Sequence, residues 1–236
     1  MSDLPSYTVA VPSSTTFGVI NRIEVNWNHL VKRREFVLRE MEDKDFNYLV
    51  LPEVERLLSV IDDGTTHLAA YTLWVTGARV SELLTLRPMD FSLEQGDSFV
   101  SMPTLKNRTP KRARPPRRIL TLADPAYLET LRRYIKTQRI QKKDPIFDLS
   151  RSAVRHRLNA AGKRVAPPLP LVINPHTLRH SFAINHLIHG KNLEQVQRLL
   201  GHSDKRSTEI YLRVLDADMS HHSAGTPFRM PLEVEP

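Results

Sequence analysis

The sequence predicts an α+β protein that is mainly α-helical and contains a small antiparallel β-sheet or hairpin. Apolar residues recur at helical spacing along most of the 236-residue chain. Between Phe91 and Leu122 the pattern changes, and the runs 99–102 and 118–122 alternate between apolar and polar residues as strands do. Helix-start signals follow this region, because residues suited to an N-cap recur there: Asp124, Ser150 and Asn174.

The charge of the chain favours a polyanionic partner. Its 34 Lys and Arg against 26 Asp and Glu give a formal net charge of +8. This favours nucleic acid over an anionic membrane, with a merely solvated basic surface as the alternative. The chain has no cysteine, which excludes disulfides and thiolate metal sites. No apolar run approaches the roughly 20 residues of a membrane span. We therefore expect a soluble, cytoplasmic protein.

The first part of the chain is predicted to hold one flexible and one helical segment. Residues 1–18 are rich in Ser, Thr and Pro, which predicts flexibility. From Val19 to Asp45 apolar residues at helical spacing are interleaved with basic ones, which predicts one long helix or two short ones. Such a segment either packs on the body or contacts a DNA backbone or another protomer. In the second case the contacts to DNA are expected from Lys32, Arg33 and Arg34.

Three helices are expected at the start of the main body. The first begins at Pro52, which suits the first position of a helix. The second spans about 66–75 and is broken by Gly77. A short third helix carries Arg79 and ends before Pro88. An Arg directly after a glycine turn between two apolar helices is expected to have low mobility.

A basic, proline-rich insert separates the two predicted strands. It contains no acidic residue, and its cations are suited to phosphate: Lys106, Arg108, Lys111, Arg112 and Arg114. On one interpretation the insert is a disordered basic loop that only contacts phosphates. Beyond the sheet the pattern predicts a helix over 125–141, a basic helix over 151–161 that ends at Gly162, and a helix that begins at Pro175.

Four chemically reactive side chains lie close together in the C-terminal part of the sequence. His176 and Arg179 share a helical face near a helix N-terminus, and His202 follows a glycine. Tyr211 comes nine residues later. Arg binds phosphate oxygens, His transfers protons near neutral pH, and Tyr can act as a nucleophile. This combination fits chemistry on a phosphodiester and requires no metal.

The order and spacing of these residues resemble the tyrosine site-specific recombinases, or phage-type integrases. The matching motifs are Thr76-Gly-Ala-Arg-Val-Ser-Glu-Leu83, His176-Thr-Leu-Arg-His180, Leu200-Gly-His202 and Tyr211. The resemblance covers about 47–214 and implies the catalytic-domain fold of that family there. Residues 1–46 then form a flexible N-terminus with a basic helical segment. The tail, 215–236, either docks on a neighbouring protomer or is disordered.

The resemblance implies a mechanism that uses no metal, cofactor or ATP. Tyr211 attacks a DNA phosphate and forms a 3′-phosphotyrosyl bond, while Arg79 and Arg179 stabilise the charge. Lys106, with Lys111 as second choice, protonates the leaving 5′-oxygen. His176 assists the tyrosine or binds an oxygen, and His202 donates a hydrogen bond to the phosphate. Glu82 is expected to orient Arg79 or a neighbouring base. Lys205 and Arg206 lie where family members often carry less charge, which indicates either extra phosphate contacts or a mobile helix around Tyr211.

The implied partners are double-stranded DNA and further copies of the chain. Four protomers on two DNA sites are expected during recombination, at the nucleoid or on a plasmid. Most family members carry a separate helical DNA-binding domain before the catalytic domain, whereas this chain has room for a remnant. Either the chain binds DNA with a reduced clamp, or an accessory protein completes the clamp. The alternatives are a type IB topoisomerase-like nicking and resealing enzyme and a catalytically silent DNA-binding accessory protein. Integration, resolution and inversion are not separated by the sequence.

Overall fold

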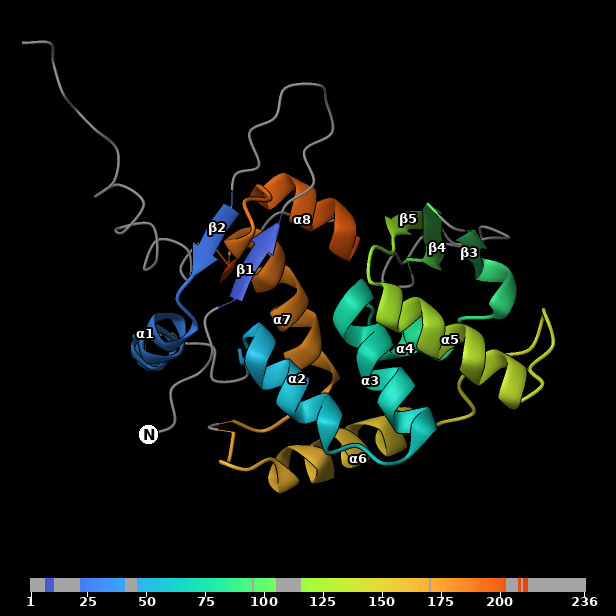
Figure 1. Cartoon of the computed structure of the whole chain (residues 1–236), viewed down its shortest axis with the longest axis horizontal. Helices are drawn as coiled ribbons and strands as arrows, with labels where there is room; N and C mark the ends of the chain where they lie inside the picture. The colour runs from blue at the N-terminus through green and yellow to red at the C-terminus, as the bar shows by residue number, and fades with distance from the viewer. Residues whose placement is uncertain are drawn as a thin grey trace, which may run out of the picture.

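The computed structural model is mainly helical and contains a small three-stranded antiparallel sheet, which confirms the predicted fold class (Figure 1). Within the described part of the chain, no helix has the length and apolar character needed to cross a membrane. The structure describes residues 7–10, 22–40, 46–94, 96–104, 116–169, 171–202, 208 and 210–211.

The helical body is organised around α3. Its helices are α2 (Leu51–Ser59), α3 (Gly64–Thr76), α4 (Val80–Leu83), α5 (Pro125–Thr137), α6 (Arg151–Arg164), α7 (Pro175–Ile188) and α8 (Leu193–Leu200). The central helix α3 packs against α2, α4, α5, α6 and α7, and Figure 1 shows it between α7 and α5. Its buried side chains include Leu68 and Leu73, both with no exposed surface, as expected for a helix surrounded on several sides.

The predicted caps fix where three of these helices begin. Asp124 accepts hydrogen bonds from the backbone N–H groups of Ala126 and Tyr127. Ser150 and Asn174 act in the same way at the starts of α6 and α7. These side chains satisfy N–H groups that have no partner within the helix, which confirms the three predicted starts.

The sheet consists of β3 (Phe91–Glu94), β4 (Asp97–Pro103) and β5 (Arg117–Thr121), in that order. The sequence predicted the last two strands, and β3 extends the sheet by one. In the register of β4 and β5, Met102 lies opposite Arg118. Alternation along β5 buries Leu120 and exposes Ile119. The buried face therefore points towards the helices, and α8 packs against β5.

The N-terminal part differs from the prediction. Strand β1 (Tyr7–Ala10) pairs antiparallel with β2 (Arg22–Val25), and the helix α1 (Trp27–Glu40) begins only after them. The structure thus has a strand at 7–10, within the segment that was predicted to be flexible. The prediction of a helix from Val19 is wrong for 22–25, which form a strand. The sequence Arg-Ile-Glu-Val alternates with a period of two and carries two β-branched residues, which favours a strand.

Arg34 on α1 is buried within the protein, so the prediction that it contacts DNA is wrong. Only 1% of the Arg34 surface is exposed, and the two terminal nitrogens of its side chain lie 2.5 and 2.8 Å from oxygens of the Glu53 carboxylate. It also donates to the Tyr48 carbonyl at 2.9 Å. A charge this deep is tolerated because a charged partner lies against it. The helix thus packs on the body, while contacts from the exposed Lys32 and the half-buried Arg33 to DNA stay a prediction.

Gly162 is a packing residue within α6, although the sequence predicted that the helix ends there. The helix continues to Arg164. A Cβ atom at Gly162 would lie 2.5 Å from Ile173 Cγ1, closer than carbon atoms pack. The glycine is therefore required by the close approach of the segment that leads into α7.

Gly162→Ala is expected to destabilise the protein by about 1–3 kcal/mol, because the new methyl group overpacks the contact with Ile173. Urea unfolding measures this change. Gly64→Ala at the start of α3 is the matched control, since no atom lies within 4 Å of its added Cβ. The control should be neutral or slightly stabilising. Gly162→Ala should cost less in an Ile173→Ala background, where the Cγ1 atom that the new methyl group meets is absent. Equal stability of the two single glycine-to-alanine variants would contradict the packing role.

Candidate active site

Arg79 lies in the turn between α3 and α4, where it is joined twice to Glu82. Gly77 ends α3 with φ 58°, a left-handed conformation that suits glycine. The backbone N–H of Arg79 donates to Glu82 Oε2 at 2.9 Å, and its Nη1 donates to Oε1 at 2.9 Å. Glu82 therefore caps the start of α4 and holds the Arg79 side chain with the same carboxylate. The Arg79 side chain keeps 14% of its surface exposed.

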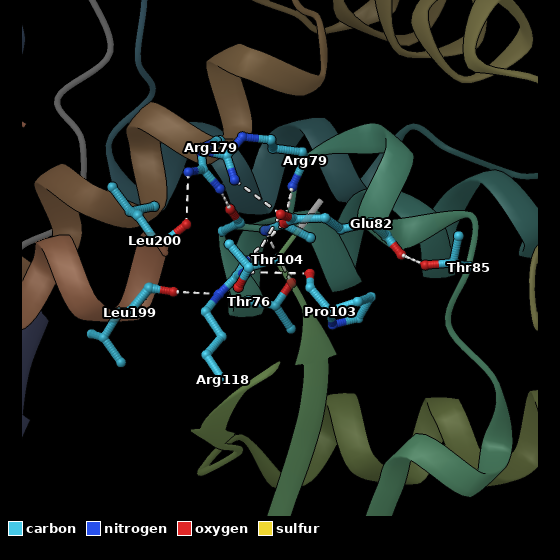
Figure 2. A network of polar contacts seen from close by, with 12 residues as sticks. Thr76, Arg79, Glu82, Thr85, Pro103, Thr104, Arg118, Arg179, Leu199 and Leu200 are labelled. Atoms are coloured by element: carbon cyan, nitrogen blue, oxygen red, sulfur yellow. Dashed lines mark hydrogen bonds and ion pairs between the residues drawn. The ribbon is translucent and has the colours of Figure 1, made fainter. Parts of the chain in front are cut away.

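Arg179 connects this turn to the end of α8. It lies on α7 and is 4% exposed. Its Nη1 donates to the Gly77 carbonyl, and its Nη2 donates to the Leu200 carbonyl at 2.8 Å (Figure 2). Burial, together with the nearby charge of Arg79, lowers the pKa of Arg179 to about 9. The guanidinium therefore stays charged at neutral pH.

Arg118 on β5 is a third arginine in the same network. Its Nη2 donates to Glu82 Oε2 at 2.8 Å, and its Nε donates to the Leu199 carbonyl at 2.9 Å. Its Nη1 also lies 3.3 Å from Thr104 Oγ1. Figure 2 shows the side chain reaching from the sheet to both helical partners. The Arg118 side chain is 9% exposed.

Arg79 and Arg118 share one acidic partner, Glu82, whose side chain has no exposed surface. Burial alone would raise the pKa of its carboxyl. The hydrogen bond and the charge of Arg118, followed by the backbone hydrogen bond and the charge of Arg79, outweigh that effect and lower the pKa below its ordinary value. Glu82 is therefore ionised at neutral pH and lies between two guanidinium groups.

His202 follows directly on the end of α8. Gly201 takes a left-handed conformation with φ 64°, which ends the helix and turns the chain towards His202. The His202 Nδ1 and Thr208 Oγ1 atoms lie 2.9 Å apart, a hydrogen-bond distance. The Leu-Gly-His segment is thus held by the bond from Arg179 to the Leu200 carbonyl and by the contact of His202 with Thr208, and Arg118 binds the Leu199 carbonyl just before it.

Tyr211 is buried, with 1% of its surface exposed. Its hydroxyl lies 3.0 Å from His180 Nδ1 on α7, and the Phe46 ring packs beside both residues. Burial raises the pKa of Tyr211 to about 12, although the charges of Arg179 and Arg79 act in the opposite direction. The phenol is therefore protonated at neutral pH and lies close enough to both arginines to be affected by their charges.

His176 lies on an exposed part of the same helix, beside a basic cavity. The cavity has a volume of about 610 Å³, and none of the residues that line it is acidic. Arg151 and Arg155 of α6 lie on one side of it, and His176 and His180 of α7 lie on the other. The first turns of two helices and two exposed arginines thus face one cavity, an arrangement that suits an anion.

The structure brings together most of the predicted catalytic residues that it describes. Arg179 donates to the Gly77 carbonyl in the turn that carries Arg79, and Tyr211 contacts His180, the neighbour of Arg179 on α7. His176 lies beside His180, with 6.4 Å between the two ring centroids. The remaining predicted site residues lie outside the described residues: Lys106, Arg108, Lys111, Arg112, Arg114, Lys205 and Arg206. Among the described residues, no three His, Cys, Asp or Glu side chains are grouped to hold a metal ion.

Arg118 was missed by the sequence-based prediction of the site, although the strand pattern contained a signal. In a strand, Arg118, Leu120 and Leu122 share one face. Leu120 and Leu122 are apolar and buried, so the pattern places a cation on the buried face. A buried cation requires a charged or strongly polar partner, which here is Glu82.

Comparison with known proteins identifies relatives along most of the chain. Residues 47–218 match the model of the phage integrase family. A protein of Escherichia coli named "Probable site-specific recombinase in afa region" is 33% identical over 179 residues, which cover 73% of this chain and 72% of the relative. A protein named "Resolvase" from Escherichia coli strain K12 is 34% identical over 78% of each chain.

A solved structure shares the fold at lower identity. The XerH site-specific recombinase bound to its difH substrate superposes with a TM-score of 0.61 at 21% identity. The match covers 77% of this chain and 54% of the XerH chain. At this level of identity the likeness establishes the shared fold.

His180 should make stability depend on pH. Burial lowers its pKa to about 3, from an ordinary value of 6.5, so the unfolded chain binds more protons between these values. The stability that the neutral imidazole contributes is complete above pH 6.5 and is lost as pH falls towards 3. His180→Gln should therefore reduce the loss of unfolding free energy between pH 7.5 and 5.5 by about 1 kcal/mol. Urea unfolding at both pH values measures it, and an unchanged loss in the variant would contradict this prediction.

Proposed function

The chain belongs to the phage integrase family and is a tyrosine recombinase, an enzyme that cleaves and rejoins DNA strands, and we propose that Tyr211 is its nucleophile. The family match confirms the resemblance carried by the sequence motifs. The observation that carries the proposal is the position of the Tyr211 phenol, which lies within the electrostatic reach of both Arg79 and Arg179. The phenol also lies 3.0 Å from His180, on the same helix as His176 and Arg179, so the proposed nucleophile and the cations that would bind a phosphodiester belong to one site.

In the proposed reaction the Tyr211 oxygen forms a bond to phosphorus, and the bond from phosphorus to the 5′-oxygen breaks. The product is a 3′-phosphotyrosyl link and a free 5′-hydroxyl, so rejoining is the same exchange in reverse. Arg79 and Arg179 stabilise the negative charge that spreads over the phosphate oxygens. Lys106 protonates the leaving oxygen, His176 assists removal of the tyrosine proton, and His202 donates a hydrogen bond to the phosphate.

Tyr211 must move before it can react. In the described arrangement Tyr211 is buried, packs against the Phe46 ring and is hydrogen-bonded to His180, so a duplex has no access to the phenol. Burial raises the pKa of Tyr211 to about 12, so the phenol proton must also be removed before the oxygen can attack. We propose that this arrangement is a resting position and that DNA binding accompanies the release of the side chain.

The basic cavity beside His176 is proposed as part of the surface that holds the DNA backbone. Arg151 and Arg155 are exposed, and they face the cavity that also opens on His176 and His180. A duplex placed with its reactive phosphate at Arg79 would present neighbouring phosphates to cations of this kind. The predicted contacts from Lys32, Arg33, Arg108, Lys111, Arg112, Arg114, Lys205 and Arg206 belong to the same proposal.

Resolution is the form of recombination that we propose. It is supported by relatives that carry the name resolvase and align over 78% or more of both chains. Exchange between two sites requires two duplexes, each cleaved on two strands. The proposed active assembly therefore contains four protomers on two DNA sites.

Covalent trapping tests the proposed nucleophile. The protein is mixed with fragmented plasmid and genomic DNA in EDTA and quenched with SDS, and protein–DNA adducts are detected on a denaturing gel. The wild type should form adducts, and Tyr211→Phe should form none, because it lacks the attacking oxygen. Sequencing the attached DNA identifies the cleavage site.

Tyr134→Phe is the matched control in the trapping experiment. Tyr134 lies on α5, where its hydroxyl is 2.9 Å from Thr65 Oγ1, so removal of this hydroxyl leaves the site intact. The control should form adducts at the wild-type level. Adducts that persist in Tyr211→Phe, or their absence from the wild type on every fragment, would overturn the proposed role of Tyr211.

The salt dependence of binding tests the proposed DNA surface. Arg151→Gln and Arg155→Gln should each reduce the slope of log affinity against log salt concentration by about 1, because one fewer counterion is released from the duplex. Fluorescence anisotropy with a labelled duplex measures the slope. Lys163→Gln is the control, because Lys163 is exposed at the other end of the same helix. Equal slopes for all three variants and the wild type would contradict this placement of the DNA.

A further inference from the structure

We propose that Arg118 is a positioning residue for DNA cleavage, which fixes Arg79 and His202 in one arrangement through Glu82 and the end of α8. The inference rests on the proposed function, in which Arg79 and His202 contact the phosphate. Arg118 is suited to this role because its guanidinium joins three separate segments. These are α4 through Glu82, the end of α8 through Leu199, and the end of β4 through Thr104.

The first part of this role is the sharing of Glu82 with Arg79. Each Glu82 oxygen faces both arginines: Oε1 lies 2.9 Å from Arg79 Nη1 and 3.4 Å from Arg118 Nη1. Oε2 lies 2.9 Å from the Arg79 backbone nitrogen and 2.8 Å from Arg118 Nη2. Because Glu82 is fully buried, water does not screen its charge. Arg118 therefore offsets the carboxylate, and the charge of Arg79 remains available to a phosphate.

The second part is the placement of His202. The Arg118 Nε donates to the Leu199 carbonyl, one of the last carbonyls of α8, which have no partner within the helix. The guanidinium also lies against Gly201, where an added Cβ would come within 3.0 Å of Nη1. The turn that leads into His202 is thus in direct contact with the side chain that holds Glu82.

The geometry requires an arginine in particular. One guanidinium presents five N–H donors in a rigid plane, which allows Arg118 to serve a carboxylate, a backbone carbonyl and a hydroxyl at once. A lysine keeps the charge but concentrates it on one nitrogen. A methionine fills a similar volume without charge or donors. The two substitutions therefore separate the charge of Arg118 from its bridging geometry.

The closing experiment measures the rate of adduct formation on a synthetic duplex that carries the cleavage site recovered by trapping. Arg118→Met should lower the single-turnover rate about 100-fold, because Glu82 then neutralises Arg79 and the turn before His202 is released. Arg118→Lys should fall between Arg118→Met and the wild type. Both variants should bind the duplex as the wild type does.

Arg117→Lys is the matched control. Arg117 is the preceding residue of β5, and its guanidinium pairs with Asp90 and Ser101 rather than with Glu82. The control should cleave at the wild-type rate.

A neutral phosphate distinguishes positioning from a general structural effect. A duplex with a methylphosphonate at the cleaved position lacks the negative charge on which Arg79 acts. On this duplex the penalty of Arg118→Met should shrink, whereas a folding defect would lower both rates equally. An equal penalty on both duplexes, or a wild-type rate in both Arg118 variants, would overturn the inference. Absence of wild-type adducts would instead overturn the proposed function, and this inference with it.

Discussion

The buried carboxylate of Glu82 is the group on which the rest of the site depends. A site for a phosphodiester needs concentrated positive charge, but guanidinium groups close to one another repel. The repulsion is visible at Arg179, whose pKa is lowered by burial and by the charges of Arg79 and Arg118 and is raised by Glu82. Glu82 lies between Arg79 and Arg118 and bonds to both. Three guanidinium charges and one carboxylate leave two positive charges in the site, which favours an anion while the empty protein remains stable.

Helix ends supply the second constraint. The last carbonyls of a helix have no partner within it, so they are natural acceptors for a buried cation. The Leu199 and Leu200 carbonyls at the end of α8 accept from Arg118 and Arg179, and the Gly77 carbonyl after α3 accepts from Arg179 as well. These bonds bring the sequence-distant turns at Gly77 and Gly201 together. The glycines end the helices in the left-handed conformation, and the arginines hold the resulting turns in place.

Local signals in the sequence predicted much of this arrangement. The features that depend on contacts between distant segments could not be predicted in this way. Caps such as Asp124 and Asn174 and the glycine after α3 define helix ends with nearby residues, so their positions could be predicted.

Arg34 was assigned to DNA because a basic helical face is compatible with solvent, DNA or an internal partner, and the partner Glu53 lies 19 residues away. Gly162 was taken as a helix end because the approach of Ile173 belongs to a separate segment. The alternation along β5 indicated that Arg118 is buried, but its partner Glu82 lies 36 residues away, so the contact between them could not be predicted from a short stretch of sequence. The catalytic residues were predicted from their motifs, and their roles await the experiments above.

The burial of Tyr211 connects the segment before the catalytic body to the reaction. Phe46 packs with its ring centroid 4.6 Å from that of His180 and 5.7 Å from that of Tyr211. Phe46 belongs to the same apolar cluster as Val25 and Trp27, which precede and begin α1. The buried pair of Arg34 and Glu53 fixes α1 to the start of α2 beside this cluster.

If Tyr211 leaves this cluster, apolar surface is exposed and the contact of Tyr211 with His180 is lost, and both changes oppose release. The segment that precedes the body therefore stabilises the buried position of Tyr211. In the proposed mechanism, contacts with DNA or with another protomer supply the free energy that releases the side chain.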